Sequence, residues 1–277
     1  MLAETAYGKS SVRLVKVSRY GDRHDLKDLT VSIRFEGEYD QSYTDGDNRE
    51  VLPTDTMKNT VYALAATNSV AEPEAFGRVL AEHFLERNPR LRRVRIDLTE
   101  QAWGRIAIGA REHGQAFVRQ SAEARSATVQ GQGDRITIGA GVKDLVILKS
   151  SRSGFTGFLR DAYTTLPDVA DRILATALTA TWHYRTSDLD FNLTWRAVRN
   201  TLLEAFGEHD SRSVQHTLHA MGRAVVDNVD AVTAIRLVMP NKHHLPVDLT
   251  PLGLQNRNEI FVPTDEPYGL IEATVMR

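Results

Sequence analysis

Apolar and polar residues alternate along several segments of the chain, and this alternation predicts half-buried strands. The clearest example has its apolar positions at Leu29, Val31, Ile33 and Phe35. A period of two puts these residues on one face of a strand, as in an antiparallel sheet with one face in the core. Residues 12–17 are predicted to be the hairpin partner of this strand. Further strands are predicted at residues 94–98, 116–129, 145–149, 178–185, 235–239 and 270–275.

Helical spacing of apolar residues predicts helices at 54–66, from Glu72-Pro73 onward, at 191–206 and at 213–226. Pro53 pre-sets the backbone angle for the first of these helices, and Thr54 or Asp55 is expected to cap its free N–H groups. Asp210 and Ser211 are the expected caps of the last helix. Together the elements predict an α+β fold.

The order strand, strand, helix, helix, strand, strand occurs twice along the chain. We therefore predict two tandem units, residues 1–133 and 134–277, separated at the polar, glycine-rich turn Gly131-Gln132-Gly133-Asp134. Each antiparallel sheet would carry its helices on one face. Long strands with a second face left over favour closure with other subunits.

Composition narrows the class of protein. The chain has 277 residues, of which 42% are hydrophobic and 25% charged, and a formal net charge of −2. This balance gives no electrostatic footprint for nucleic acid or an anionic membrane. The absence of cysteine excludes disulfides, thiolate nucleophiles and sulfur-ligated zinc. Without a long apolar run or a signal pattern, the chain is expected to be cytoplasmic.

Two clusters look chemical but have simpler interpretations. The arginines at positions 87, 90, 92, 93 and 95 lead into a predicted strand and are interpreted as a solvated sheet edge. His216 and His219 can share a helix face, but no cysteine or clustered carboxylate completes a metal site there. No metal is therefore predicted.

Several polar motifs remain, and their order runs through nearly the whole chain. They are Tyr7-Gly8-Lys9, Thr54–Tyr62, Ser153–Leu166, Asp171–Thr176, Ala180–Tyr184, Ser213-Val214-Gln215 and Pro240-Asn241-Lys242-His243. In sequence and spacing these motifs resemble the urate oxidase (uricase) family. The run Phe-Leu-Arg-Asp-Ala-Tyr-Thr-Thr-Leu is the most specific of them.

This resemblance implies both a fold and a reaction. The fold would be the tunnelling fold, or T-fold, with two units per chain, a barrel closed by two chains, and two barrels stacked into a homotetramer. The reaction would be oxidation of urate by O2 to 5-hydroxyisourate with release of H2O2. It would need no metal, flavin or haem cofactor, and no nucleic-acid or membrane partner is implied.

The resemblance also implies a set of substrate-binding residues. Urate is a flat anionic purine, and Arg172 and Gln215 would offer donors to one side of its ring. Phe155 would stack on the ring. The backbones of Val214 and Asp55 would complete the in-plane hydrogen bonds.

The catalytic residues implied by the resemblance are Lys9, Thr54 and His243. Lys9, hydrogen-bonded to the Thr54 hydroxyl, would act through a water as the base. A lysine can do so near neutral pH only where burial or a nearby cation lowers its pKa, so Lys9 is expected to be desolvated in the assembled site. His243, rather than the adjacent His244, would extend the proton relay, and Asn241 with Thr54 would hold oxygen or water above the ring.

In the family these residues meet across a subunit interface, so the resemblance implies active sites shared between subunits. The chain departs from the family pattern at His113-Gly114-Gln115-Ala116-Phe117, where many relatives have a second histidine in place of Gln115. Little of the C-terminal tail seen in relatives is expected after the last predicted strand. Two alternatives stay open: a pterin- or purine-handling enzyme of the same fold, and a purine-binding protein without activity.

Overall fold

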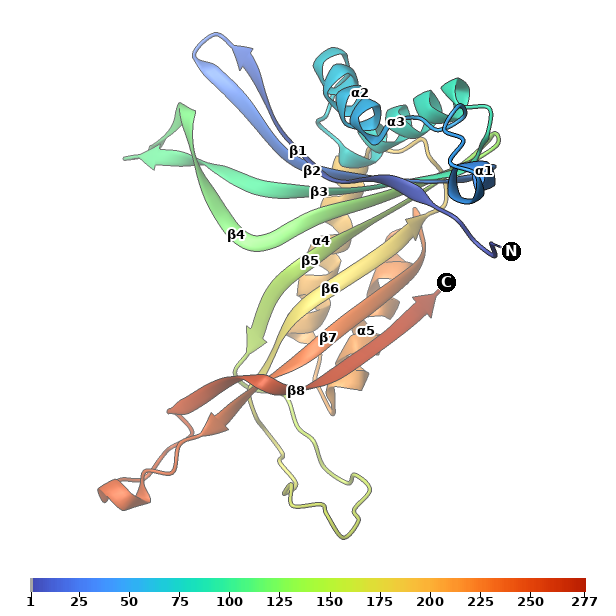
Figure 1. The fold of residues 1–277 in the computed structure, drawn as a ribbon. Coiled ribbons are helices and arrows are strands. Elements are labelled where there is room, and N and C mark those ends of the chain that lie inside the picture. The colour runs from blue at the N-terminus through green and yellow to red at the C-terminus, as the bar shows by residue number, and fades with distance from the viewer. Residues whose placement is uncertain (1) are drawn as a thin grey trace. The chain divides into compact units, whose positions relative to one another are not determined.

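The computed structural model describes residues 2–277, which form eight strands, five α-helices and one 3-10 helix (Figure 1). In chain order these are β1 (Tyr7–Tyr20), β2 (Arg23–Gly37), α1 (Asp40–Thr44), α2 (Thr54–Thr67), α3 (Pro73–Arg87), β3 (Leu91–Ile108), β4 (Arg111–Gln132), β5 (Arg135–Lys149), β6 (Leu174–Tyr184), α4 (Phe191–Glu208), α5 (Val214–Asn228), β7 (Val232–Pro246), η1 (Thr250–Leu252) and β8 (Phe261–Met276). Apart from the short helices α1 and η1, the order ββααββ occurs twice, as the sequence predicts.

Hydrogen bonds join the eight strands into one sheet in chain order, from β1 to β8. The pairs β1–β2, β2–β3, β3–β4 and β7–β8 are antiparallel. The predicted α+β class, with an antiparallel sheet and helices on one of its faces, is therefore confirmed. Among residues 2–277, no helix combines the length and the apolar character needed to cross a membrane.

The chain forms two compact units, which are described separately below. Unit 1 is Met1–Gly141 with His183–Trp195, and unit 2 is Val142–Trp182 with Arg196–Arg277. The repeat boundary between residues 133 and 134 stays a prediction. It falls in the turn between β4 and β5, where Gly133 has a φ of 55°.

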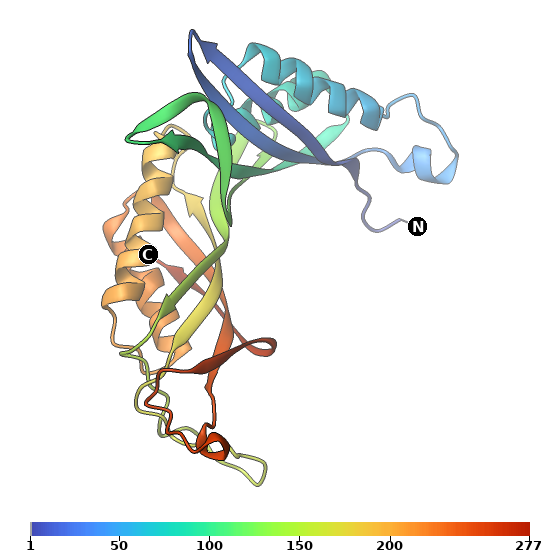
Figure 2. The same cartoon turned by 90° about the vertical axis from the view of Figure 1, so that its left-hand side faces the viewer.

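In unit 1, α2 and α3 cover one face of the strands (Figures 1 and 2). The alternating residues of β2 predicted to be buried are at most 3% exposed, and β1 is the hairpin partner of β2. α3 lies close to the sheet because residue 77 is glycine. A Cβ there would come within 2.7 Å of the Val129 side chain and 2.8 Å of Leu98.

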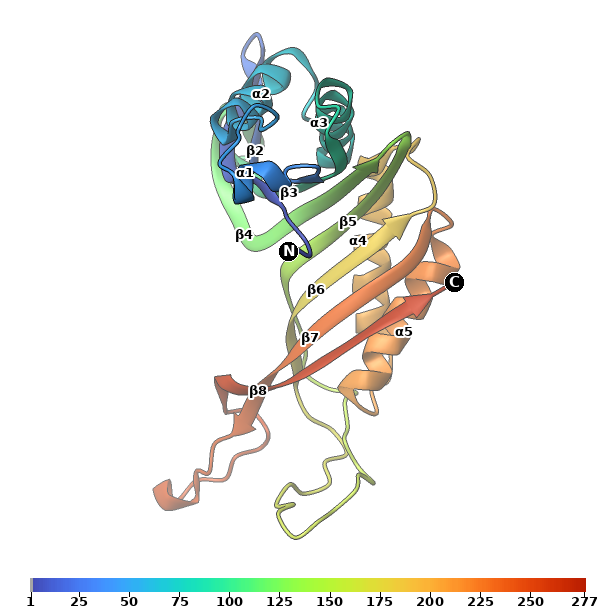
Figure 3. The same cartoon turned by 45° about the vertical axis from the view of Figure 1, so that its right-hand side comes forward.

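In unit 2, α5 packs against β7 and β8, and α4 lies beside it on the same face (Figures 1 and 3). Ile235, Leu237 and Met239 of β7 are fully buried, as their alternation predicts. In this unit a long irregular segment, residues 150–173, connects β5 to β6 and projects away from the sheet (Figure 3). It contains the Ser153–Leu166 motif.

The predicted helix caps are wrong at both of the sites considered. The residue before α2 is Pro53, and neither Thr54 nor Asp55 caps the helix. The Asp55 carboxylate instead accepts hydrogen bonds from Lys58 and Asn59, one turn further along. α5 is capped by Ser213, whose Oγ accepts the His216 N–H at 3.1 Å. Asp210 instead pairs with Arg152, and Ser211 bridges to Ser153.

The interpretation of the arginine cluster as a sheet edge is also wrong. Arg92, Arg93 and Arg95 lie on β3, which is paired with β2 on one side and β4 on the other. Arg92 forms an ion pair with Glu38, and Arg93 forms one with Glu36. Their exposure reflects a polar sheet face, not a free edge.

Candidate functional site

The Tyr7-Gly8-Lys9 motif begins β1 at a point where the strand is irregular. A Cβ on Gly8 would lie 1.9 Å from the Ile33 carbonyl oxygen, so only glycine allows β1 to approach β2 this closely. The register between the two strands shifts between Lys9 and Val12, and Ser11 there has a φ of 57°. Such a bulge changes the direction of side chains near it, and Lys9 is the last paired residue before it.

Tyr7 connects this strand to the start of α2. Its hydroxyl accepts the Leu52 N–H at 3.0 Å, two residues before Thr54. Its ring packs edge-on against Phe35 and Tyr39, and burial raises the pKa of its hydroxyl. Sequence reasoning gave Tyr7 no role, although its place directly before Gly8 and Lys9 was the available signal.

The first turn of α2 offers unpaired N–H groups to a ligand. Met57 donates to the Pro53 carbonyl, whereas the N–H groups of Thr54, Asp55 and Thr56 have no acceptor within the described residues. The hydrogen-bonded Lys58 ammonium lowers the pKa of the Asp55 carboxyl, and the positive charge of Lys9 adds to this effect. Lys9 is therefore within electrostatic reach of Asp55. No hydrogen bond between Lys9 and Thr54 is present in residues 2–277 of the single chain.

In unit 2, residues 153–155 are held between two other segments. Ser153 forms a parallel bridge with Ser211, and Gly154 N–H donates to the Ser211 carbonyl at 2.8 Å. On the other side, Phe155 and Val169 exchange two backbone hydrogen bonds, and Arg172 N–H donates to the Ser153 carbonyl at 2.7 Å. These contacts bring the Phe155 motif, the Arg172 motif and the segment before α5 together.

Asp171 supports the same arrangement with its side chain. Its carboxylate accepts hydrogen bonds from the Ser151 hydroxyl at 2.6 Å and the Ser153 N–H at 3.1 Å. These two contacts lower the pKa of the Asp171 carboxyl, the Ser151 bond most. Asp171 belongs to the Asp171–Thr176 motif, but its supporting role was not predicted.

Arg172 lies beside the aromatic ring with which it is predicted to bind urate. Its guanidinium carbon is 5.3 Å from the centre of the Phe155 ring. The side chain is half buried, and this burial lowers the pKa of the guanidinium. No carboxylate or carbonyl within residues 2–277 accepts a hydrogen bond from it. A desolvated cation without a partner is unfavourable, and a bound anion would relieve that cost.

The start of α5 adds two further N–H groups. Ser213 accepts from His216 and Thr217 through its Oγ and its carbonyl, which leaves the N–H groups of Val214 and Gln215 without an acceptor in the described chain. Val214 is buried and the Gln215 side chain is exposed. The free N–H groups and the amide of Gln215 can thus face a ligand.

Asn241 and His243 lie on β7 at a second irregularity. The register between β7 and β8 shifts between them, with Asn241 opposite Gly269 and His243 opposite Thr264. Both side chains are half buried. His244, set aside in favour of His243, has its Nδ1 3.2 Å from the Lys242 carbonyl oxygen. No hydrogen bond in the described chain links Asn241 or His243 to Phe155 or Arg172.

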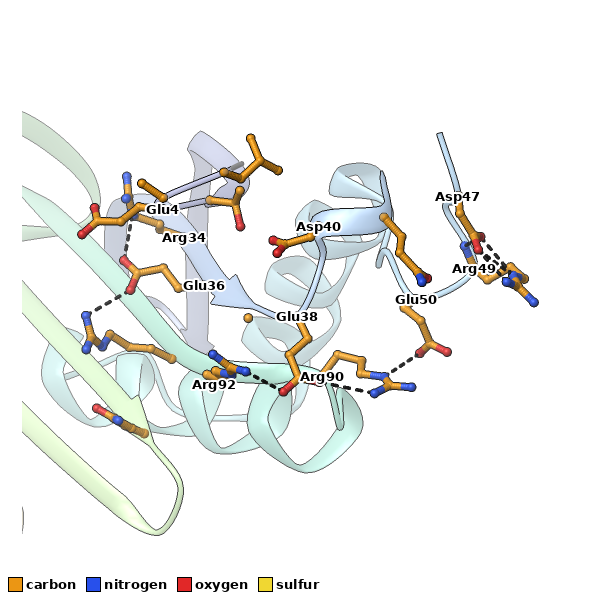
Figure 4. A pocket seen from close by; sticks show the side chains of 17 residues that line it. Glu4, Arg34, Glu36, Glu38, Asp40, Asp47, Arg49, Glu50, Arg90 and Arg92 are labelled. Atoms are coloured by element: carbon orange, nitrogen blue, oxygen red, sulfur yellow. Dashed lines mark hydrogen bonds and ion pairs between the residues drawn. The ribbon is translucent and has the colours of Figure 1, made fainter. Parts of the chain in front are cut away.

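A cavity of about 810 Å³ lies elsewhere in unit 1 and is lined by none of the predicted site residues (Figure 4). Five arginines line it: Arg34, Arg49, Arg90, Arg92 and Arg93. Each is within 3.3 Å of a carboxylate of Glu36, Glu38 or Asp47. Because these charges already compensate one another, the cavity has no free guanidinium to attract an anion. Arg172 differs from them in this respect.

Comparison with known proteins gives a consistent result. The antiparallel sheet, with the element order ββααββ occurring twice and helices on one face, is that of the T-fold class. The family model described as Uricase matches residues 5–130 and 138–272. The chain belongs to the uricase family.

Individual relatives match over nearly all of this chain and most of their own length. The uricase of Arthrobacter globiformis is 43% identical over 277 residues, which cover 100% of this chain and 90% of the relative. The uricase of Aspergillus flavus is 37% identical, with 98% of this chain and 95% of the relative covered. The crystal structure of the Arthrobacter globiformis uricase has a TM-score of 0.96 and covers 100% of this chain and 95% of that chain.

Proposed function

We propose that this protein oxidises urate with O2 and water to 5-hydroxyisourate and H2O2. The observation that carries the proposal is Arg172, a half-buried guanidinium without an internal acceptor, 5.3 Å from the centre of the Phe155 ring. A flat anion satisfies both groups, since its charge compensates the guanidinium and its ring can stack on the phenyl ring. Urate, the substrate that gives the family its name, is such an anion.

The remaining binding residues fit the edge of a purine. Gln215 offers an amide that can donate and accept, and Val214 offers a free backbone N–H. Asp55 contributes through its backbone, because its carboxylate is already engaged with Lys58 and Asn59. The free N–H groups of the first turn of α2 support this assignment.

The chemical step begins with removal of a proton from bound urate, which makes the ring electron-rich enough to transfer electrons to O2. Lys9 is the proposed base, acting through a water held by the Thr54 hydroxyl, with His243 extending the relay. Asn241 and Thr54 hold O2 above the ring. The ring loses two electrons and gains a hydroxyl from water, and O2 takes up two electrons and two protons to leave as H2O2.

The proposed active assembly is a homotetramer in which each site draws Lys9, Thr54 and Asp55 from one chain and the other site residues from a neighbour. Within the described chain, β1 and β8 each pair with only one strand, so each leaves an open edge. Pairing of such edges between copies would close the barrel. A cytoplasmic location is part of the same proposal.

The test follows urate absorbance and peroxide together, using protein treated with a chelator and then dialysed. We expect one H2O2 formed and one O2 consumed for each urate lost, at an unchanged rate after chelation. Loss of urate without O2 consumption, or no loss at all, would contradict the proposal. A pterin-handling enzyme of this fold would turn over a pterin instead, although Gln215 lacks the carboxylate expected to anchor one.

A further inference from the structure

The segment that carries Phe155 has little hydrophobic core of its own. Two of its large apolar side chains, Leu159 and Tyr163, are 95% and 91% exposed in the chain. An aromatic ring on such a segment has no packed surface behind it unless the segment supplies one. Phe155 nevertheless needs a fixed orientation if it is to stack on a planar substrate.

Phe158 supplies that surface. Its ring lies 4.7 Å from the Phe155 ring, centre to centre, and the two planes differ by 8°. Gly157, with a φ of 69°, makes the turn that brings Phe158 back onto Phe155. The turn is fixed by the Gly157 N–H, which donates to an Asp168 carboxylate oxygen at 3.1 Å.

Arg160 holds Phe158 in turn. Its guanidinium carbon lies 4.7 Å from the centre of the Phe158 ring. The guanidinium donates to the Leu166 carbonyl at 3.0 Å and lies 3.4 Å from the other Asp168 carboxylate oxygen. The result is a column of four side chains, Arg172, Phe155, Phe158 and Arg160, in which each contacts the next.

We propose that Phe158 is a positioning residue that, held by Arg160, fixes the Phe155 ring for stacking on the substrate. This inference rests on the proposed function, since it concerns how the same site binds urate. Phe158 is not expected to touch urate. A ring that occupied the substrate position itself would have to move when urate binds, but Phe158 is held by Arg160 and by the Gly157 turn.

The test compares Phe158→Leu with Phe158→Tyr. Leucine removes the parallel ring, whereas tyrosine keeps it and should behave as wild type. With stacking lost, we expect the KM for urate to rise about five- to tenfold while kcat changes less than about twofold. The Kd of urate in O2-free buffer, measured by calorimetry, should rise by the same factor. Arg160→Gln should shift the Kd in the same direction, by about twofold.

Leu159→Ala is the matched control, because Leu159 is the next residue and is almost fully exposed. Its Kd should equal that of wild type. An unchanged Kd in both Phe158→Leu and Arg160→Gln would overturn the inference, as would tighter urate binding in Phe158→Leu, which would mean that Phe158 competes with the substrate. If Phe158→Leu does not fold, Arg160→Gln decides. Wild-type protein that neither binds nor oxidises urate would overturn the proposed function instead.

Discussion

The Arg172 guanidinium is half buried, and no carboxylate or carbonyl of residues 2–277 accepts a hydrogen bond from it. Arg125, for comparison, is also buried, but it lies 2.7 Å from the Glu74 carboxylate and donates to Asn192 at 2.6 Å. Burial of a charge is tolerated in proteins where a partner compensates it. Arg125 is compensated within the fold, whereas the proposed partner of Arg172 is the bound substrate.

This contrast predicts opposite phenotypes for two similar substitutions. Arg172→Gln should lower kcat/KM for urate by about 10- to 100-fold, the value of a charge-assisted contact of about 1.5–3 kcal/mol. Its Tm should change little, because the guanidinium makes no internal hydrogen bond or ion pair and loses only its contact with the Phe155 ring. Arg125→Gln should lower stability by about 3–5 kcal/mol, since it leaves Glu74, which is fully buried, without its partner. Kinetics and thermal melts on both variants check this, and a large loss of Tm in Arg172→Gln would contradict a ligand-binding role.

The sequence indicated Arg172, Phe155 and Gln215 through their motifs, but not the residues that hold them. Phe158 and Arg160 stand in the same motif, yet their role depends on the turn at Gly157 and on how two rings meet in space. Ser211 was interpreted as a helix cap because serine is a common cap. It instead bridges to Ser153, a contact 58 residues away in sequence that no local pattern encodes.

At the scale of elements, periodicity predicted which segments form strands and helices but not where they end. β3 was expected at residues 94–98 and extends from Leu91 to Ile108. Its inner residues are buried in alternation, whereas its last residues, such as Ile106 and Ile108, are exposed. At this end of β3 the backbone still pairs with β4, but neither face of the strand is buried. The alternation of apolar and polar residues that predicts a strand is therefore missing from the sequence.

Two neighbouring histidines where α4 is followed by α5, His209 and His216, predict a pH dependence of stability. His209 follows α4, and its Nε2 lies 3.2 Å from Nδ1 of His216 in the first turn of α5. Burial, and then the charges of His216, Lys149 and Arg152, lower the pKa of His209, with Asp210 opposing them. The unfolded state therefore binds more protons than the folded state below the ordinary histidine pKa of about 6.5. The contribution of neutral His209 to the free energy of unfolding is therefore present above that pH and is lost as the pH falls.

We accordingly expect the Tm of the wild-type protein to fall more between pH 7.5 and pH 5.5 than the Tm of His209→Gln. Thermal melts across this range measure the difference. His219→Gln is the control, because His219 is exposed on the same helix α5 and should keep the wild-type slope. Parallel curves of Tm against pH for wild type and His209→Gln would show that His209 does not cause the pH dependence.

At the scale of the whole molecule, the fold class followed from the order of elements, and the family followed from motifs spread over nearly the full chain. Neither the fold class nor the family depends on the exact ends of strands or on helix caps. Both predictions therefore hold although several strand ends and caps were predicted wrongly. The proposed assembly belongs to another level, since no periodicity in a single chain specifies which copies meet. The division of the site residues between the two units nevertheless allows the proposed assembly to be tested.

Lys9 and Thr54 belong to unit 1 and Arg172 to unit 2, so subunit mixing tests whether neighbouring chains share each site. Lys9→Ala and Arg172→Ala should each be inactive alone. After subunit exchange at equal amounts, a site can combine the intact unit 1 of one chain with the intact unit 2 of another, which restores up to about a quarter of wild-type activity. Lys9→Ala mixed with Thr54→Ala should stay inactive, because both changes lie in the same half of the site. If tagged chains demonstrably exchange and Lys9→Ala with Arg172→Ala recovers nothing, each site is built within one chain.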